Sequence, residues 1–126
     1  MHLRVLLILI LGSCSVIAQS STTSLQQSGP TKQYFIAIFS KGPAWNEAKP
    51  ANEQNGFKEH SDNLRPLRAE KKLSIGGRYA EKGMVIVEAQ NEADAKSFFV
   101  ADMMLEKKTF VLELNQFRPF YKGTIE

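Results

Sequence analysis

Beyond its first 18 residues the chain contains one histidine, His60, and the spacing of its neighbours places that side chain on the apolar stripe of a predicted helix. Phe57 precedes it by three residues, and Leu64 and Leu67 follow it by four and seven, which is the spacing of one helical face. An imidazole that points into an interior is either a hydrogen-bonded core residue or a group that works as an acid or base. His60 is therefore the first candidate for chemistry.

A carboxylate shows the same anomaly on a second predicted helix. Asp102 falls in register with Ala95, Phe98 and Leu105, on the face that we expect to be buried. The alternative is that the helix stops earlier and that Asp102 lies at its end, in contact with solvent. Two titratable side chains directed at one interior are the strongest functional indication in the sequence.

The N-terminal segment has the features of a secretory signal peptide. A basic start is followed by an unbroken apolar run from Val5 to Leu11 and by small residues that end at Ala18. A membrane span usually needs about 20 apolar residues, whereas polar residues begin here at Ser13. We therefore predict export to the periplasm or the outside, without a membrane span, and a signal over residues 1–18.

Two cleavage sites are consistent with this segment. Val16 and Ala18 predict a cut before Gln19, whereas residues 11–14 resemble a bacterial lipobox that would leave Cys14 as a lipid-anchored N-terminus. We favour the first because the apolar run before Cys14 is short for the lipid route. The mature chain then has no cysteine, and so no disulfide, thiol nucleophile or cysteine metal ligand.

Composition divides the remainder into a linker and one domain. Residues 19–32 are rich in Ser, Thr and Gln and predict a flexible linker, and residues 33–126 predict one small domain with a thin core. The net charge of +3 falls by one to +2 when Arg4 leaves with the signal, and charges of both signs are interspersed. Because nucleic-acid binding needs a clustered basic face, we expect no nucleic-acid partner.

The order of predicted elements indicates the fold class. A long loop over residues 41–55 carries the only tryptophan, and Pro66 should bend the first helix or delay its start. Strand, helix, strand, strand, helix and strand follow one another at residues 33–40, 56–72, 74–79, 84–89, 91–104 and 109–115. This βαββαβ order predicts an α+β, ferredoxin-like domain, with an antiparallel sheet and both helices on one face.

The first predicted strand is apolar on both faces. Phe35, Ala37 and Phe39 point one way, and the residues between them, which are also apolar, point the other. Two helices can cover only one face of the sheet. We therefore predict a homodimer in which the uncovered sheet faces pack together, as in a dimeric α/β barrel.

An ordered set of motifs resembles the YCII-related family, also called YciI-like or DGPF-domain proteins. The resemblance covers residues 33–126, and its Gly-Pro-x-Trp loop is typical of one branch of the family. The motifs are Gly42-Pro43-Ala44-Trp45 with Gln54, Glu59-His60 with Leu64, Leu67 and Leu73, Gly76-Gly77, Gly83-Met84-Val85, the segment 93–102, and Phe117-Arg118-Pro119-Phe120. The resemblance implies a ferredoxin-like domain of the dimeric α/β-barrel type.

The resemblance also implies an active site, a histidine–aspartate pair that matches His60 and Asp102. A carboxylate bonded to one imidazole nitrogen fixes the tautomer and leaves the other nitrogen free to act as a base. The chain departs from the family in three places: Met103 follows the aspartate where the family has proline, Lys71 or Lys72 replaces a glycine after the first helix, and Arg78 replaces a proline. These three changes affect the expected shape of the substrate pocket more than the assignment of the histidine–aspartate pair.

Five further residues are candidates for substrate binding. Trp45 either closes a pocket with its ring or anchors its loop, and Gly76 and Gly77 either leave room for a ligand or mark a bulge. Arg78 either binds a carboxylate or is solvated. Gln54 is included on the resemblance alone.

Three functions are consistent with these residues. The first is an exported enzyme that uses the pair for general acid/base chemistry on a small organic acid or lactone, of isomerase, lyase or hydrolase type. The others are a non-catalytic module that binds a small ligand and a dimerisation unit. One histidine with scattered carboxylates lacks the ligand spacing of a metal site, so we expect no metal and no cofactor.

Overall fold

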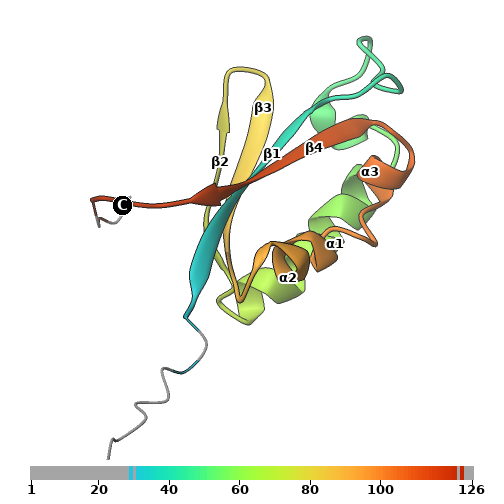
Figure 1. Ribbon diagram of the computed structural model, residues 1–126. Coiled ribbons are helices and arrows are strands. Elements are labelled where there is room, and N and C mark those ends of the chain that lie inside the picture. Colours follow the sequence, from blue (N-terminus) through green and yellow to red (C-terminus); the bar gives the residue numbers. More distant parts are fainter. Residues whose placement is uncertain (1–28, 30, 122, 124–126) are drawn as a thin grey trace, which may run out of the picture.

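The computed structural model describes residue 29, residues 31–121 and residue 123 (Figure 1). The predicted signal over residues 1–18, with Cys14, and most of the predicted linker over residues 19–32 lie outside the described residues. In the described part of the chain, no helix is both long and apolar enough to cross a membrane.

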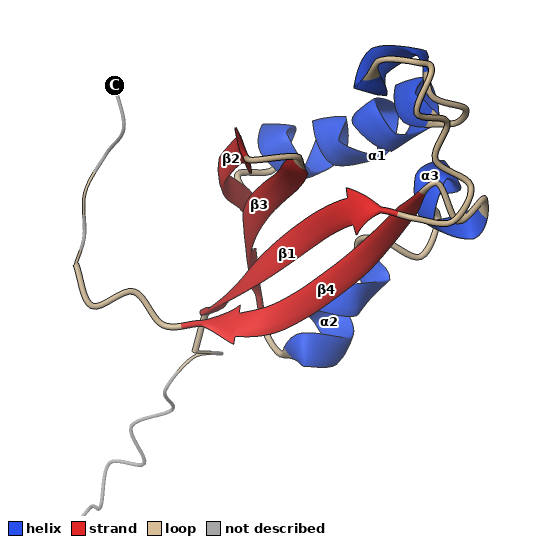
Figure 2. Cartoon of the chain, turned by 90° about the horizontal axis from the view of Figure 1, so that it is seen from above, coloured by secondary structure: helices blue, strands red, loops and turns tan. Residues whose placement is uncertain are grey.

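The described residues form an α+β structure built on a four-stranded antiparallel sheet, with strand order β2-β3-β1-β4 (Figures 1 and 2). This order is compatible with the predicted ferredoxin-like fold. The elements are β1 (Gln33–Lys41), η1 (Ala51–Glu53), α1 (Phe57–Ala69), β2 (Leu73–Tyr79), β3 (Lys82–Ala89), α2 (Glu92–Ser97), α3 (Met103–Glu106) and β4 (Phe110–Phe117).

One face of the sheet forms the core with the helices, which Figure 1 shows on one side of the sheet. Period-two alternation directs every second residue of β1 and β3 toward this face. The buried cluster consists of Phe35, Ala37, Phe39, Val85, Val87, Ala89, Ala95 and Phe99, and Leu64 of α1 packs against it. The predicted inward face of β1 is therefore confirmed.

The other face of the sheet carries apolar side chains that no described element covers. Tyr34, Ile36 and Ile38 of β1 are half-buried, and on the outer strands Tyr79 and Val111 are 45% and 52% exposed. The register places Ile36 and Ile38 beside Ile86 and Met84 of β3, so these residues form an apolar patch over β1 and β3, whereas β4 places Asn115 and Glu113 beside them.

The first helix forms as predicted, with small differences at its ends. It begins at Phe57 after Gly56, whose backbone is left-handed (φ 89°), so Pro66 does not delay its start. The helix continues through Pro66 to Ala69. Lys71 then adopts φ 57°, the conformation that favours glycine after a helix. Lys71 thus adopts a backbone conformation that glycine would take without strain.

The prediction of one continuous second helix over residues 91–104 is wrong. Asn91 caps α2 by accepting a hydrogen bond from the Asp94 backbone N–H at 2.9 Å, but α2 ends at Ser97. A new helix, α3, begins at Met103 with Asp102 as its N-cap. An aspartate side chain that accepts a backbone N–H bond favours a helix start over a helix interior, and this explains the break.

The β2–β3 hairpin determines which side chains face the helices. Residues 80 and 81 form its turn, and Arg78 pairs with Gly83 on the strand side of it. The irregularity in the β2–β3 ladder lies between Leu73 and Ile75, whereas Gly76 and Gly77 pair regularly. The interpretation of these two glycines as a bulge is therefore wrong.

Candidate active site

The imidazole of His60 lies in an aromatic cage between α1 and the sheet. The residue is 8% exposed. The ring of Phe39 meets it edge-on with centroids 4.9 Å apart, and Phe110 does so at 5.3 Å. Phe57, one turn earlier on α1, lies at 6.3 Å. The aromatic rings fix the plane of the imidazole by contact on several sides.

Asp102 approaches the same imidazole from the break between α2 and α3. Its Oδ2 lies 2.5 Å from His60 Nδ1, and its Oδ1 accepts a hydrogen bond from the Met104 backbone N–H at 3.0 Å. Asp102 is 0% exposed, and both of its oxygens have a partner. A buried carboxylate is costly unless it is paired and hydrogen-bonded, and this one is both.

A close approach of two segments brings the aspartate to the histidine. Gly56 precedes α1 directly, and a β-carbon there would lie 3.2–3.3 Å from side-chain and backbone atoms of Met103, tighter than ordinary packing. The glycine thus allows the start of α3 to lie against the start of α1. Met103 is the first residue of α3, and the Asp102 side chain caps this helix through the Met104 backbone N–H.

The geometry assigns different tasks to the two imidazole nitrogens. An ionised carboxylate can only accept, so Nδ1 donates its proton to Asp102. In the neutral ring the lone pair is then on Nε2. This nitrogen is therefore the one that can accept a proton from, or return it to, a bound molecule.

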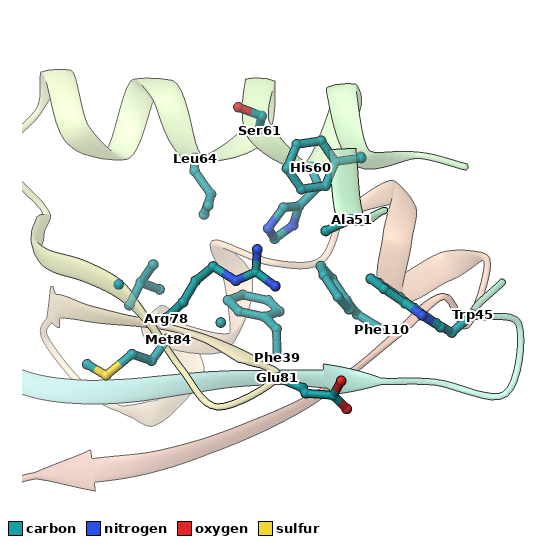
Figure 3. A pocket seen from close by; sticks show the side chains of 14 residues that line it. Phe39, Trp45, Ala51, His60, Ser61, Leu64, Arg78, Glu81, Met84 and Phe110 are labelled. Atoms are coloured by element: carbon teal, nitrogen blue, oxygen red, sulfur yellow. The ribbon is translucent and has the colours of Figure 1, made fainter. Parts of the chain in front are cut away.

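A pocket of about 300 Å³ opens beside His60 (Figure 3). Its walls are mainly apolar and come from β1, α1, β3, β4 and the loop after β1. They include Phe39, Trp45, Phe57, Leu64, Met84, Val85 and Phe110. The polar side chains at the pocket are those of His60, Ser61, Arg78 and Glu81. A base in an apolar pocket with few polar groups is typical of a small-molecule site.

Trp45 forms part of the pocket wall and also anchors its loop. Its ring stacks on Phe110 with centroids 5.7 Å apart and an interplanar angle of 22°. The ammonium group of Lys41 lies 5.5 Å from the tryptophan ring. The two interpretations of Trp45 therefore hold together, because the same stacking holds the loop and closes one side of the pocket.

Gln54 holds the loop instead of lining the pocket. It is buried, and its amide donates to the carbonyl oxygens of Asn46 and Lys49 at 2.7 and 2.8 Å. Its Oε1 accepts from the Asn46 backbone N–H at 3.0 Å. With its donors and acceptor engaged in this way, Gln54 positions the loop that carries Trp45.

The other predicted binding residues divide between two hollows. Gly77 and Arg78 line the pocket beside His60, whereas Gly76 lines a neighbouring hollow with Arg68 and Leu73. Figure 3 shows the guanidinium of Arg78 and the imidazole of His60 pointing toward one another across the pocket. The structure thus brings Trp45, Gly77 and Arg78 together with the pair and leaves Gly76 outside.

A chain of ion pairs lies at the mouth of the pocket. Lys41 contacts Glu47 at 2.8 Å and Glu81 at 3.2 Å. The hydrogen bond to Glu47 is the main cause that raises the pKa of Lys41; desolvation opposes it, and Glu81 adds a further increase. Because the carboxylates of Glu47 and Glu81 are largely in solvent, the pairs contribute little to stability, and their main effect is to neutralise these two carboxylates.

Most of the lining residues were not in the predicted site, and Phe110 and Ser61 are two examples. Phe110 is the first residue of β4 on the inward face that it shares with Leu112 and Leu114, so strand alternation could have identified it. Ser61 follows His60 on α1, and nothing in the sequence distinguishes it from an exposed polar residue. Within residues 29, 31–121 and 123, no group of three or more His, Cys, Asp or Glu side chains could hold a metal ion.

Comparison of the chain with protein-family models, with curated proteins and with solved structures found no significant match.

Proposed function

We propose that this protein is a small enzyme that uses His60 and Asp102 for general acid/base chemistry on a small organic molecule. One observation supports this above the others: a fully buried carboxylate bonded to Nδ1, with a pocket on the imidazole. General acid/base catalysis of this kind contributes on the order of 10²–10⁴-fold in rate.

The reaction that suits this arrangement is proton transfer at one carbon. A C–H bond beside a carbonyl breaks, and the proton passes to His60 Nε2. The C–H electron pair forms a carbon–carbon double bond, and the π pair of the carbonyl moves to its oxygen. Return of the proton to another carbon gives an isomerisation, and loss of a leaving group from the adjacent carbon gives an elimination. The same nitrogen can instead take a proton from water and so promote hydrolysis. None of these steps needs a nucleophile from the protein.

A purely structural histidine explains less of this geometry. A buried imidazole needs one acceptor for its proton, and a backbone carbonyl would suffice. Here the acceptor is a buried carboxylate, whose desolvation is costly. The family resemblance of residues 33–126, which pairs the same two positions, supports the same conclusion.

The test is a screen of the purified protein against small carboxylic acids and lactones. His60→Ala should lose turnover and remain folded. Lys58→Ala, an exposed position on the same helix, is the matched control and should keep full activity. Turnover by His60→Ala at the wild-type rate would exclude His60 as the base.

A non-catalytic binding module is the second candidate. The observation in its favour is that, among the described residues lining the pocket, Glu81 is the one carboxylate, and it is engaged with Lys41. A reaction that needs a separate acid would therefore have to use the protonated form of His60. In a binding module, His60→Ala would change the affinity for a ligand, and no wild-type turnover would be seen.

The uncovered sheet face supports a homodimer as part of this proposal. The apolar patch around Ile36 would be buried if two sheets packed face to face. An interface on this face is self-complementary under two-fold symmetry. The domain would then be one half of a dimeric α/β barrel, and its pocket would remain on the helical side of each sheet.

Export through an N-terminal signal is also part of the proposal. The apolar run over residues 5–11 and the small residues before Gln19 support it. Mass spectrometry of the protein secreted by a bacterial host tests it directly. A mature N-terminus at Gln19 is expected, and a lipid-modified Cys14 would favour the alternative cut.

A further inference from the structure

The position of Arg78 raises the question of what this side chain binds. Strand alternation and the pairing of Arg78 with Gly83 place it on the helical face of β2. Gly83 has no side chain, and a β-carbon built there would meet only Phe39, at 3.9 Å. Figure 3 shows its guanidinium in the pocket, below the imidazole of His60 and beside Phe39.

The guanidinium has no protein partner among residues 29, 31–121 and 123. No carboxylate of this part of the chain lies within ion-pair distance of Arg78, and no side-chain hydrogen bond involves it. Glu81, the acid that lines the same pocket, pairs with Lys41 instead. Arg78 is an exposed residue, so part of its side chain meets solvent, and its N–H donors at the pocket are not bonded to Ser61, Glu81 or His60.

We propose that the pocket takes a ligand with one carboxylate on an aromatic or compact apolar body, and that Arg78 binds this carboxylate. The inference rests on the proposed function, since it names the substrate class of the same site. A planar guanidinium binds a carboxylate through two parallel hydrogen bonds. The rings of Phe39, Trp45 and Phe110 supply the apolar contact for the rest of the ligand.

The charge of the pocket favours a carboxylate over a phosphate. Among the described residues that line it, Arg78 is the one permanently charged cation, and Glu81 adds a negative charge at the mouth. One guanidinium balances a monoanion, whereas a phosphate dianion would retain an unbalanced charge beside apolar walls. Arg78 is thus a binding residue that orients the ligand, with the carbon to be deprotonated toward His60.

The experiment compares two probes of nearly equal shape, benzoate and benzamide. Binding to the wild-type protein is followed by the fluorescence of Trp45, the only tryptophan in the chain, and independently by calorimetry. Benzoate should bind about 10–100-fold more tightly than benzamide, as expected for charge-assisted hydrogen bonds. Arg78→Gln should remove the preference for benzoate. Arg78→Lys should retain part of this preference, because lysine keeps the positive charge but cannot form the two parallel hydrogen bonds of a guanidinium.

Arg65→Gln is the matched control, because it removes an exposed arginine of α1 that pairs with Asp62. It should leave both affinities within about twofold, the scale of a surface charge change. Equal affinities of the wild type for the two probes would overturn the inference, as would an unchanged benzoate affinity in a folded Arg78→Gln variant.

Failure of this inference can be told apart from failure of the proposed function. Equal binding of the probes with loss of turnover in His60→Ala would refute only the role of Arg78. Benzoate binding that depends on Arg78, with no wild-type turnover of any substrate, would refute only the enzymatic function.

Discussion

The carboxylate of Asp102 joins two parts of the molecule, because one of its oxygens bonds to His60 and the other caps α3. Oδ2 lies 2.5 Å from His60 Nδ1, and Oδ1 accepts the Met104 backbone N–H at 3.0 Å. The cap fixes the rotation of the carboxylate, and the fixed carboxylate orients the imidazole. The geometry of the His60–Asp102 pair and the stability of the start of α3 therefore depend on the same side chain.

This double role predicts different effects for two substitutions of Asp102. Asp102→Asn keeps an oxygen for the Met104 N–H, so its amide nitrogen must face His60 and donate to Nδ1. The imidazole is then forced into the tautomer with a proton on Nε2, which cannot act as a base. We expect a loss of about 10²–10⁴-fold in turnover with a fall of about 1 kcal/mol or less in the free energy of unfolding. Urea denaturation and kinetics on the same preparation measure both.

Asp102→Ala should be much less stable than Asp102→Asn. It removes the cap, which costs about 0.5–2 kcal/mol, and leaves a buried imidazole N–H without an acceptor, which costs about 1–3 kcal/mol more. Equal unfolding free energies for the two variants would contradict the double role.

Gly42 should be intolerant of any side chain. A β-carbon at this position would overlap the carbonyl oxygen of Lys108, a backbone atom that cannot move without α3 and β4. Gly42→Ala should therefore lower the free energy of unfolding by about 1–3 kcal/mol and disturb the loop with Trp45. Gly77→Ala is the control, because nothing lies within 4 Å of a β-carbon there. Thermal unfolding of the two variants should differ clearly, and similar melting temperatures would refute the contact.

Lys71 offers a stabilising substitution. Its φ of 57° is unfavourable for a residue with a side chain and free of strain for glycine. Lys71→Gly should raise the free energy of unfolding by about 0.5–1 kcal/mol, since the relief of strain exceeds the added entropy of the unfolded chain. Ala69→Gly, at the last residue of α1, should lower it by about 1 kcal/mol. If both glycines destabilise the protein equally, Lys71 carries no strain.

The open sheet face predicts how the oligomeric state responds to a charge. Ile36→Glu places a carboxylate at the centre of the apolar patch, where a second sheet would have to bury it. We expect a dimer for the wild type and a monomer for this variant in analytical ultracentrifugation. Val100→Glu, at an 81% exposed position outside the sheet, should leave the dimer intact. A monomeric wild type at all concentrations would exclude the sheet-to-sheet homodimer.

Most of the helices and strands were predicted from the periodic spacing of apolar residues, which can be read directly from the sequence. The alternation around Ala37 and the stripe around His60 each record a burial that the structure also has. Asp102 shows the limit of the method. Its inward direction was predicted correctly, but on a helix, whereas it is an N-cap that is buried by the close approach of Gly56 to α3.

The residues around the pocket were harder to predict because their roles depend on neighbours distant in sequence. The side chain of Gln54 forms its hydrogen bonds with backbone groups of its own loop. The sequence alone does not distinguish such a glutamine from one that binds a ligand. Gly76 and Gly77 are adjacent in sequence but line different hollows, which both lie between β3 and α1 and share Ser61, Leu64 and Val85. The ring of Phe110 stacks on that of Trp45 because β4 pairs with β1, a contact between segments that are distant in sequence.

The central claim is that His60, oriented by Asp102, transfers protons in the pocket, and hydrogen–deuterium exchange tests it most directly. In D₂O, NMR follows the loss of protons beside the carbonyl of phenylpyruvate and of its neutral relative phenylacetone, so that the result does not depend on Arg78. The account predicts that the wild type accelerates exchange of at least one probe, that His60→Ala does not, and that added imidazole restores part of the rate. Equal rates for the wild type and His60→Ala on both probes would contradict it.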